Sequence, residues 1–394
     1  MSSKAKTTAT QEEATPALVP KLRFPEFRGA GGWKQTPLEY CLDYQQPTPY
    51  LVADTKYSPA FKTPVLTAGK TFILGYTDEQ NGIFSEGLPV IIFDDFTTAT
   101  QFVDFPFKVK SSAMKILQAK NGADIKFMYE TLQTLAYEVG AHERHWISIF
   151  APMSVPVPNP AEQQKIAECL SSVDNLIAAQ VRKVDALKTH KKGLMQQLFP
   201  MEGETQPRLR FPEFQNAGEW EESIVGELIV TITPPKKLQT SDYQPEGEFP
   251  IVDQSQDYIC GWTNDGEAVI DKGLPVIVFG DHTCALKFID QPFAQGADGI
   301  KILRPKRGID IRFLFCALEA DPVVQESYKR HFSILREKKL FYPDPKSGEQ
   351  HRIASCLSSL DALITLETQK LEALKTHKKG LMQQLFPSPE EIEA

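Results

Sequence analysis

The most regular hydrophobic pattern lies near the end of each half of the chain. Apolar residues follow one another at alternating intervals of four and three through residues 166–198, and again through residues 353–385. A heptad stripe of this kind is typical of a helix that packs lengthwise on a partner helix. The stripe consists of Ile166, Leu170, Val173, Ile177, Val184, Leu187, Leu194 and Leu198 in the first copy, and of Ile353, Leu357, Leu360, Ile364, Leu371, Leu374, Leu381 and Leu385 in the second. We therefore predict two long coiled-coil helices whose seam is formed by these residues.

Both predicted helices carry start and stop signals. Residues 159–162 read NPAE, which fits an Asn cap, a Pro at the first helical position and a Glu three residues after the cap. Residues 347–350 read SGEQ, which fits an S-x-x-Q capping box, and Pro200 and Pro387 end the two patterns. A helix of this length spans roughly 60 Å.

Two polar positions interrupt each stripe. They are Gln180 and Lys191 in the first copy, and Glu367 and Lys378 in the second. A polar residue in such a seam can set the register of the pair at some cost in stability.

The helical stretches are parts of one duplicated unit. The fifteen letters ALKTHKKGLMQQLFP at residues 186–200 return at residues 373–387, an offset of 187, and PKLRFPEF at 20–27 is answered by PRLRFPEF at 207–214. Two equal units that exchange equivalent contacts favour a pseudo-two-fold arrangement, in which the helices run antiparallel with a globular domain at each end. Two independent helix-capped domains in tandem remain the alternative.

The middle of each copy has diverged and reads as mostly β. Short β-branched and aromatic runs alternate with Gly, Pro and Asp through residues 36–157 and 223–341, which is typical of strands between turns. The clearest match is GLPVIIFD at 87–94 against GLPVIVFG at 273–280, and short helical patterns follow at 125–137 and 309–318. We predict an α/β (α+β) fold: two related, mostly-β domains separated by two long antiparallel helices.

This interpretation divides the chain into seven segments. They are a disordered leader (1–19), a first domain (20–158), a first helix (159–200), a linker (201–206), a second domain (207–345), a second helix (346–387) and a disordered tail (388–394).

Composition is that of an ordinary globular protein. Hydrophobic residues make up 41% of the chain and charged residues 24%, and no apolar run approaches the length of a membrane span. The N-terminal stretch lacks the apolar centre of a signal peptide, so we expect a cytoplasmic protein. The net charge is −8, made up of +1 for residues 1–200 and −9 for residues 201–394. Any nucleic-acid site must therefore be a local patch, or be completed by a partner.

Motifs that carry catalytic chemistry are missing from the sequence. There is no phosphate-binding loop, no dinucleotide fingerprint, no methyltransferase motif and no pair of cysteines spaced for zinc among the six present. Glu337, Lys338 and Lys339 match the end of a nuclease motif, but the Pro-Asp that should precede them follows instead, and we interpret the match as a coincidence. We predict no catalytic and no metal-binding residues.

Three motifs carry a resemblance to a known family. They are the repeated LRFPEF segment, the helix start PNPAEQQKIA at 158–167 and the helix end KKGLMQQLFP. Over residues 20–387 the chain resembles the specificity subunit of type I restriction–modification enzymes. The blocks at 87–112 and 273–301 look like that family's target recognition domains.

The resemblance implies a function without chemistry on this chain. Each target recognition domain would read one half of a bipartite sequence in double-stranded DNA. The helical rod would set the half-site spacing and dock two methyltransferase (modification) subunits, and restriction (translocase/nuclease) subunits would join them. The chain itself would carry no cofactor, because S-adenosylmethionine, ATP and Mg would bind the partner subunits. A bacterial cytoplasmic location and no membrane contact are implied as well.

Candidate DNA-contacting residues follow from the chemistry of base edges and phosphates, which accept contacts from basic, amide, hydroxyl and carboxylate groups. The candidates are Thr97, Thr98, Lys108, Lys110, Ser111, Ser112, Arg144 and His145 in the first domain, and Asp281, His282, Thr283, Lys287, Gln295, Lys301, Arg330 and His331 in the second. Arg-His recurs in both copies, which suits a shared phosphate role. Two rival hypotheses are an enzyme with an unrecognised site and a coiled-coil scaffold that never touches DNA.

Overall fold

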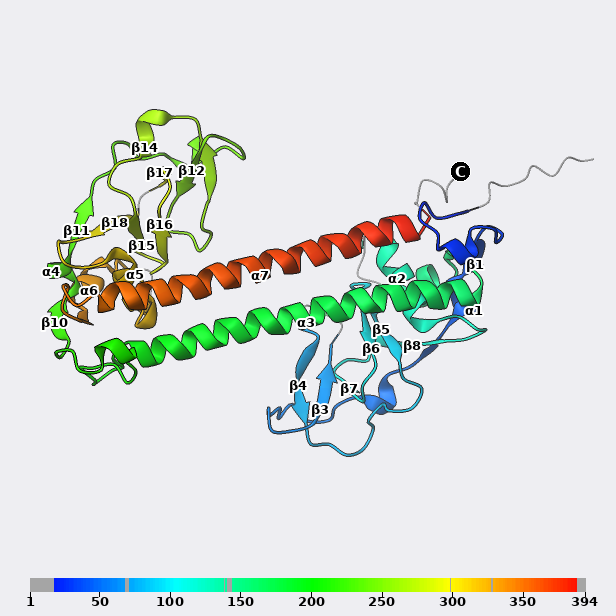
Figure 1. Cartoon of the computed structure of the whole chain (residues 1–394). Helices are drawn as coiled ribbons and strands as arrows, with labels where there is room; N and C mark the ends of the chain where they lie inside the picture. Colours follow the sequence, from blue (N-terminus) through cyan, green and yellow to red (C-terminus); the bar gives the residue numbers. More distant parts are fainter. Residues whose placement is uncertain are drawn as a thin grey trace, which may run out of the picture. The chain divides into compact units, whose positions relative to one another are not determined.

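The computed structural model describes residues 18–67, 71–137, 139, 144–297, 299–326 and 329–387 (Figure 1). The predicted tail and all but the last two residues of the predicted leader lie outside these ranges. The chain forms two compact units, the first made of residues 1–180 and 370–394 and the second of residues 181–369. Each unit therefore contains one β-rich domain and a part of both long helices, a division that cuts across the helices. None of the helices in the described ranges combines the length and hydrophobicity that a membrane span requires.

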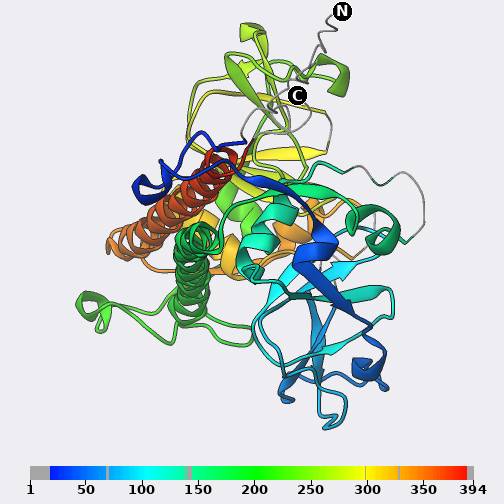
Figure 2. The ribbon, with the colours of Figure 1, turned by 90° about the vertical axis from the view of Figure 1, so that its right-hand side faces the viewer.

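The two predicted long helices are present as α3 (Pro160–Leu198) and α7 (Glu349–Leu385). All of their predicted seam residues are buried or half-buried, whereas Leu176 and Leu363 outside the seam are exposed. In the first unit, Ile166 near the start of α3 shares an apolar cluster with Leu385 at the end of α7. Figure 2 shows the green start of α3 beside the red end of α7 in that unit.

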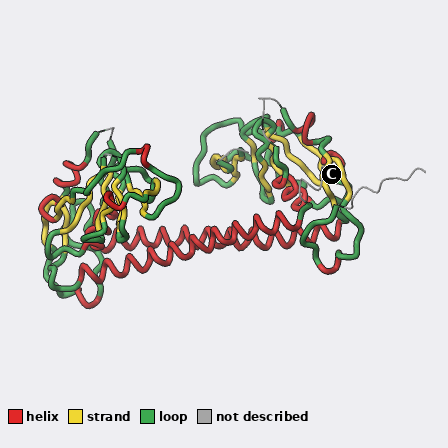
Figure 3. The backbone as a smooth tube through the Cα atoms, turned by 90° about the horizontal axis from the view of Figure 1, so that it is seen from above, coloured by secondary structure: helices red, strands yellow, loops and turns green. Residues whose placement is uncertain are grey.

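The second unit contains the complementary pairing. Leu198 at the end of α3 shares a cluster with Ile353 and Leu357 near the start of α7. Each unit thus joins a helix start to a helix end, and Figure 3 shows the helices in red running alongside each other within each unit. The predicted antiparallel pairing is confirmed, and the tandem alternative is wrong.

Each β-rich domain contains three small sheets. In the first unit, one sheet has the strand order β2-β8-β5-β6. In a second sheet, β3 lies between β4, to which it is antiparallel, and β7, to which it is parallel. A third sheet pairs β1 with β9. The first-unit strands are β1 (Lys34–Pro37), β2 (Leu42–Gln45), β3 (Thr63–Leu66), β4 (Ile73–Thr77), β5 (Val90–Asp94), β6 (Thr100–Val103), β7 (Lys108–Val109), β8 (Met114–Ala119) and β9 (Ser154–Val157).

The second unit repeats this arrangement with one more short strand. The four-stranded sheets have the orders β11-β18-β15-β16 and β13-β12-β17-β14, and β10 pairs with β19. Its strands are β10 (Glu221–Ile224), β11 (Ile229–Ile232), β12 (Phe249–Val252), β13 (Gly261–Thr263), β14 (Val269–Ile270), β15 (Val276–Gly280), β16 (Leu286–Ile289), β17 (Phe293–Gln295), β18 (Ile300–Pro305) and β19 (Lys339–Tyr342). The two matched GLPV segments feed β5 and β15, which lie inside their sheets.

Short helices complete both units. Those of the first unit are α1 (Leu38–Cys41) and α2 (Ile125–Thr134), with further turns at Pro25–Phe27, Thr48–Tyr50 and Trp146–Phe150. Those of the second are α4 (Val225–Leu228), α5 (Ile311–Ala320) and α6 (Phe332–Glu337), with turns at Pro212–Phe214, Thr240–Asp242 and Gly266–Ala268. Helix α2 ends three residues before the predicted end of its pattern, and α5 begins two residues after the predicted start.

The long helices share a hydrophobic core with the domain in each unit. Phe386, just after α7, stacks on Phe127 of α2 with ring centroids 5.4 Å apart. Phe199, just after α3, packs on Phe313 of α5 at 5.5 Å. Because the end of a long helix supplies part of the domain's core, domain and helix pair form one packed body within each unit.

An ion pair with a buried glutamate ties the LRFPEF segment to the start of each long helix. Arg23 donates from Nε and Nη2 to the two carboxylate oxygens of Glu162, both at 2.7 Å, and Arg210 pairs with Glu349 in the same way. The predicted Asn cap of α3 is confirmed, since Oδ1 of Asn159 accepts the N–H of Glu162 at 3.0 Å, while the Glu162 side chain binds the arginine.

The glutamine after each glutamate binds the domain, so the capping box predicted for Ser347 and Gln350 is wrong. Gln163 accepts the N–H of Asp124, and Gln350 accepts the N–H of Asp310, so each joins a long helix to the start of α2 or α5. Sequence periodicity does not reveal this use, because the partners lie about forty residues away along the chain.

We expect Glu162→Gln to lower the free energy of unfolding by about 3 kcal/mol, since it leaves the charge of Arg23 buried without its counter-charge. Chemical denaturation of the full chain measures this. Glu168→Gln, at an exposed position of the same helix, is the matched control and should change stability by less than about 0.5 kcal/mol. Equal effects of the two changes would show that the buried pair does not hold the helix start.

Candidate nucleic-acid interface

A polar turn follows β5 in the first unit and β15 in the second, and a buried aspartate holds each turn in place. In the first unit, Oδ1 of Asp95 accepts the N–H of Trp146 at 2.8 Å, and its backbone carbonyl accepts both the N–H (3.0 Å) and the ring Nδ1–H (2.9 Å) of His145. The side chains of Asp95 and His145 are both buried. We call this arrangement an Asp–His clasp.

The second unit contains the same clasp. Oδ1 of Asp281 accepts the N–H groups of His331 (3.0 Å) and Phe332 (2.8 Å), and its carbonyl accepts the ring Nδ1–H of His331 at 3.1 Å. Because these groups form hydrogen bonds inside the protein, the clasp fixes the backbone immediately before each histidine. That position is an exposed arginine in both units, Arg144 and Arg330.

The clasp therefore places an arginine near the polar turn in each domain. In the first unit, Thr97 is exposed in the turn after β5, and Asp95 N–H bonds to Ala113 O at 3.0 Å, which brings exposed Ser111 and Ser112 alongside. We call Thr97, Thr98, Ser111, Ser112 and Arg144 the first turn surface. Thr98 within it is half-buried and adopts a positive φ of 57°.

The second turn surface consists of His282, Thr283, Lys329 and Arg330. The ring Nδ1 of His282 lies 3.2 Å from the carbonyl of Lys329, so the turn and the basic segment are in contact. Thr283 donates from Oγ1 to the carbonyl of Gln254 at 2.5 Å. Side chains that suit phosphates and base edges thus gather at corresponding places in both units.

Six of the sixteen predicted DNA-contacting residues are buried, and the structure gives them internal roles. They are Lys108, His145, Asp281, Lys287, Gln295 and His331. The two histidines and the aspartate take part in the clasps, and Gln295 is the buried last residue of β17. We correct the prediction for these six, because a buried side chain has no surface to offer to a DNA groove. Arg-His recurs because the histidine is structural.

The two buried lysines organise polar loops. Lys108 donates to the carbonyl of Asn81 at 2.6 Å and pairs with Glu79 at 2.9 Å. Lys287 donates to the carbonyls of Asp253 (2.9 Å) and Asp257 (2.5 Å), and burial lowers the pKa of its ammonium group. Each lysine thus anchors its loop through backbone oxygens.

These loops hold functional candidates that the sequence analysis missed. Gln80 and Asn81 in the first loop and Gln256 in the second are exposed. Amide side chains can bind adenine with two hydrogen bonds in the major groove. In the sequence, these residues could have been found from the position of each loop between two strands. The predicted set instead included the lysines, because their positive charge suggested phosphate contact.

The remaining candidates lie at or near the surface outside the two turns. Lys110 is exposed, with Nζ 6.0 Å from the ring centre of Tyr57, and Lys301 is half-buried, with Nζ 5.5 Å from the ring centre of Phe332. Both stay predictions as DNA contacts.

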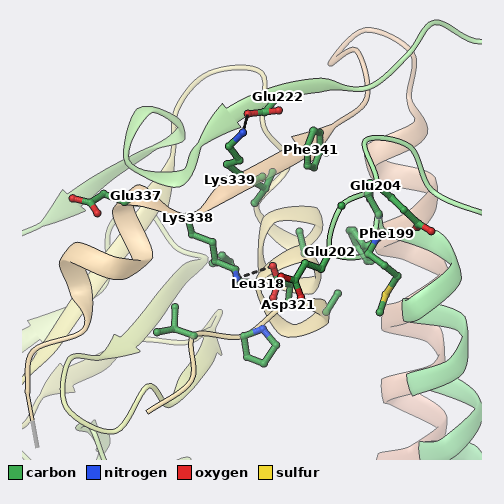
Figure 4. Close-up of a pocket in the computed structure, with 18 of the residues that line it drawn as sticks. Phe199, Glu202, Glu204, Glu222, Leu318, Asp321, Glu337, Lys338, Lys339 and Phe341 are labelled. Carbon is green, nitrogen blue, oxygen red and sulfur yellow. Dashed lines mark hydrogen bonds and ion pairs between the residues drawn. The ribbon is translucent and has the colours of Figure 1, made fainter. Parts of the chain in front are cut away.

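A pocket of about 860 Å³ in the second unit lies among the linker, α5 and β19 (Figure 4). It contains the nuclease-like triplet, but Lys338 pairs with Asp321 at 2.7 Å and Lys339 with Glu222 at 2.6 Å. Its lining has six carboxylates and two ammonium groups, a balance that repels phosphate. Within the described ranges, no group of three His, Cys, Asp or Glu side chains is arranged to hold a metal ion.

Comparison with known proteins gives a consistent family. Residues 217–376 match the family model of the type I restriction modification DNA specificity domain. The chain is 32% identical over 376 residues to the specificity subunit of the type I restriction enzyme EcoR124I/EcoR124II of Escherichia coli, covering 85% of this chain and 88% of that one. It is 25% identical over 266 residues to the MjaVIII specificity subunit of Methanocaldococcus jannaschii, covering 60% and 62%.

A solved structure has a similar fold. The S subunit of a type I restriction–modification system from M. genitalium superposes with a TM-score of 0.64 at 18% identity, covering 94% of this chain and 99% of that one. The identity is low enough that this comparison speaks to fold alone.

We expect Asp281→Ala to lower the free energy of unfolding by about 2 kcal/mol, because it leaves the N–H of Phe332 without an acceptor, whereas the N–H of His331 keeps the backbone carbonyl of residue 281. His282→Ala, one residue further along the turn, should cost under about 1 kcal/mol. Chemical denaturation of both variants tests the division into buried and surface candidates. A larger loss for the histidine variant would contradict the internal role assigned to Asp281.

Proposed function

Because this chain belongs to the family of type I restriction–modification specificity subunits, we propose that it reads a bipartite DNA target, one half with each β-rich domain. DNA sequence recognition is the function of the family. The observation that carries the bipartite proposal is the repeated Asp–His clasp, which presents an exposed arginine beside a polar turn in both units.

The differences between the two turn surfaces suit two different half-sites. The first turn offers hydroxyl groups from Thr97, Ser111 and Ser112, whereas the second offers His282 and Thr283. The arginine is common to both, and an arginine can anchor a phosphate whatever the base sequence. The proposal therefore separates a shared anchor from variable readers, which include the loops around Asn81 and Gln256.

The antiparallel helix pair supports a role as a spacer between the half-sites. Helices α3 and α7 run from one unit into the other, and a continuous helix has a fixed rise per residue. Two readers joined by such elements make half-site spacing a geometric property, as in two-fold repressors.

The outer faces of the long helices support docking of two methyltransferase subunits. Leu176 in the first unit and its repeat equivalent Leu363 in the second are exposed, although leucine is a residue type that is usually buried. Equivalent exposed leucines on near-identical helices suit two copies of one partner. We assign methyl transfer with S-adenosylmethionine, and restriction with ATP and Mg, to such partner subunits in the bacterial cytoplasm.

We expect Arg330→Gln to weaken binding of the methyltransferase complex to its target about tenfold, and to reduce the slope of log K against log salt by about 1. Titration of target DNA at several salt concentrations measures both quantities. Arg144→Gln should act similarly through the other half-site.

The matched control is Arg307→Gln. Strand β18 begins beside Gly280 at the turn and runs antiparallel to β15, so exposed Arg307 lies beyond the far end of the sheet. An equal loss for Arg307→Gln would mean that general charge, and not the turn surface, attracts the DNA.

Insertion of seven residues into both long helices, after Gln180 and after Gln369, should lengthen the preferred spacer by about three base pairs, since two helical turns span about 10.5 Å and a base pair about 3.4 Å. A seven-residue insertion preserves the heptad stripe. Mapping of methylated positions measures the spacer. Seven residues added to the linker at 201–206 should leave it unchanged. If the helix insertions also leave the spacer unchanged, the helices do not set it.

A further inference from the structure

A four-membered ion cluster joins three helices in the first unit. Lys378 on α7 contacts Glu130 on α2 at 3.0 Å and Asp174 on α3 at 2.8 Å. Lys126 on α2 closes the cluster, since its Nζ lies 2.7 Å from both carboxylates. Glu130 is fully buried, so its position is tightly restricted. Burial opposes the charge of Asp174, but its bonds to the two lysines prevail and lower the pKa of its carboxyl group.

The second unit contains the same connection built from equivalent long-helix residues. Lys191 on α3 lies 2.6 Å from Asp361 on α7 and 3.3 Å from Glu319 on α5. Burial lowers the pKa of Lys191, but the bond to Asp361 and the nearby charges outweigh it and raise the pKa overall. One lysine thus links two long helices and the short helix of the domain in each unit.

The lysines and aspartates are repeat equivalents, but the glutamates are not. Lys191 and Lys378 are 187 residues apart, as are Asp174 and Asp361. The capping residues Asp124 and Asp310 align α2 with α5 at an offset of 186. Glu130 therefore corresponds to Cys316, and Glu319 corresponds to Gln133.

The carboxylate has thus moved by three positions along the short helix, which is close to one turn and keeps it on the same face. The pKa of Cys316 is consistent with that placement: burial, with a further contribution from the charge of Glu319, raises it to about 12. Two diverged helices supply the lysine with a carboxylate from different sequence positions. A requirement for the ion pair itself explains this better than inheritance of one residue.

We propose that Lys191 and Lys378 are positioning residues that fix the orientation of each recognition domain on the long helices, and so restrict the half-site spacing that the protein accepts. This inference rests on the proposed reading of a bipartite target. Apolar contacts such as Phe127 on Phe386 are non-directional, whereas a lysine held by carboxylates on two other helices resists rotation of one against the other.

The experiment uses the full methyltransferase complex and a series of DNA targets whose spacer varies by single base pairs. Lys378→Met and Lys191→Met should reduce the preference for the best spacer over its neighbours on the order of tenfold, because small misplacements of a bound group have large effects. The half-site sequences should be unchanged. Lys379→Met and Lys192→Met remove the same charge from exposed neighbouring positions and should leave the preference intact.

A rescue pair separates positioning from general stability. Glu130→Gln should broaden the spacer preference, and adding Gln133→Glu should restore it, because that carboxylate occupies the position of Glu319 in the other unit. The inference would be overturned if Lys378→Met had the same spacer selectivity as Lys379→Met. It would also be overturned if Gln133→Glu failed to restore the selectivity lost in Glu130→Gln. A parent complex indifferent to spacer length would instead overturn the proposed function, and this inference with it.

Discussion

Burial of the two long apolar stripes is the constraint on which the rest of this structure depends. Neither α3 nor α7 can hide its stripe in a domain of modest size, so each helix pairs with the other in both units. The stripes then continue into the domains, where Phe199 and Phe386 pack among the aromatic residues of α5 and α2. A surface built on either domain therefore takes its orientation from the helix pair.

Repetition in this chain marks structural needs more often than contacts with a ligand. Arg23 with Glu162 and Asp95 with His145 are buried, as are their second-copy equivalents apart from half-buried Arg210, and each pair satisfies groups that would be costly to leave unpaired. The exposed side chains around them differ between the copies, apart from the arginine of each turn surface. The residues shared by both copies thus maintain the fold, and under the proposed function the diverged residues select the half-site.

The acidic net charge is compatible with this arrangement. Phosphate attraction depends on the local field, and each turn surface contributes at least one exposed arginine at a place where buried groups fix the backbone. Carboxylates gather elsewhere in the second unit, around the pocket beside the linker. The positions of the charged residues therefore indicate where a phosphate could bind, whereas the net charge of the chain says little about the ligand.

How much the sequence could predict depends on the range of the interaction involved. The heptad stripe, the duplication and the strands that follow GLPV arise from neighbours a few residues apart, and all of them were found as predicted. The capping box predicted at Ser347 failed because the side chain of Gln350 accepts the N–H of Asp310, 40 residues away. Lys108 and Lys287 were misassigned for the same reason, since nothing near them in the chain indicates that their partners are backbone carbonyls of a distant loop.

The duplication, the two long paired helices and the two diverged β-rich domains can all be read from the amino-acid sequence, because periodicity and repetition depend on residue order alone. Which polar residues face outward cannot be read in this way. That choice depends on which buried hydrogen-bonding groups meet after folding, as in the Asp–His clasps and the lysine that joins three helices.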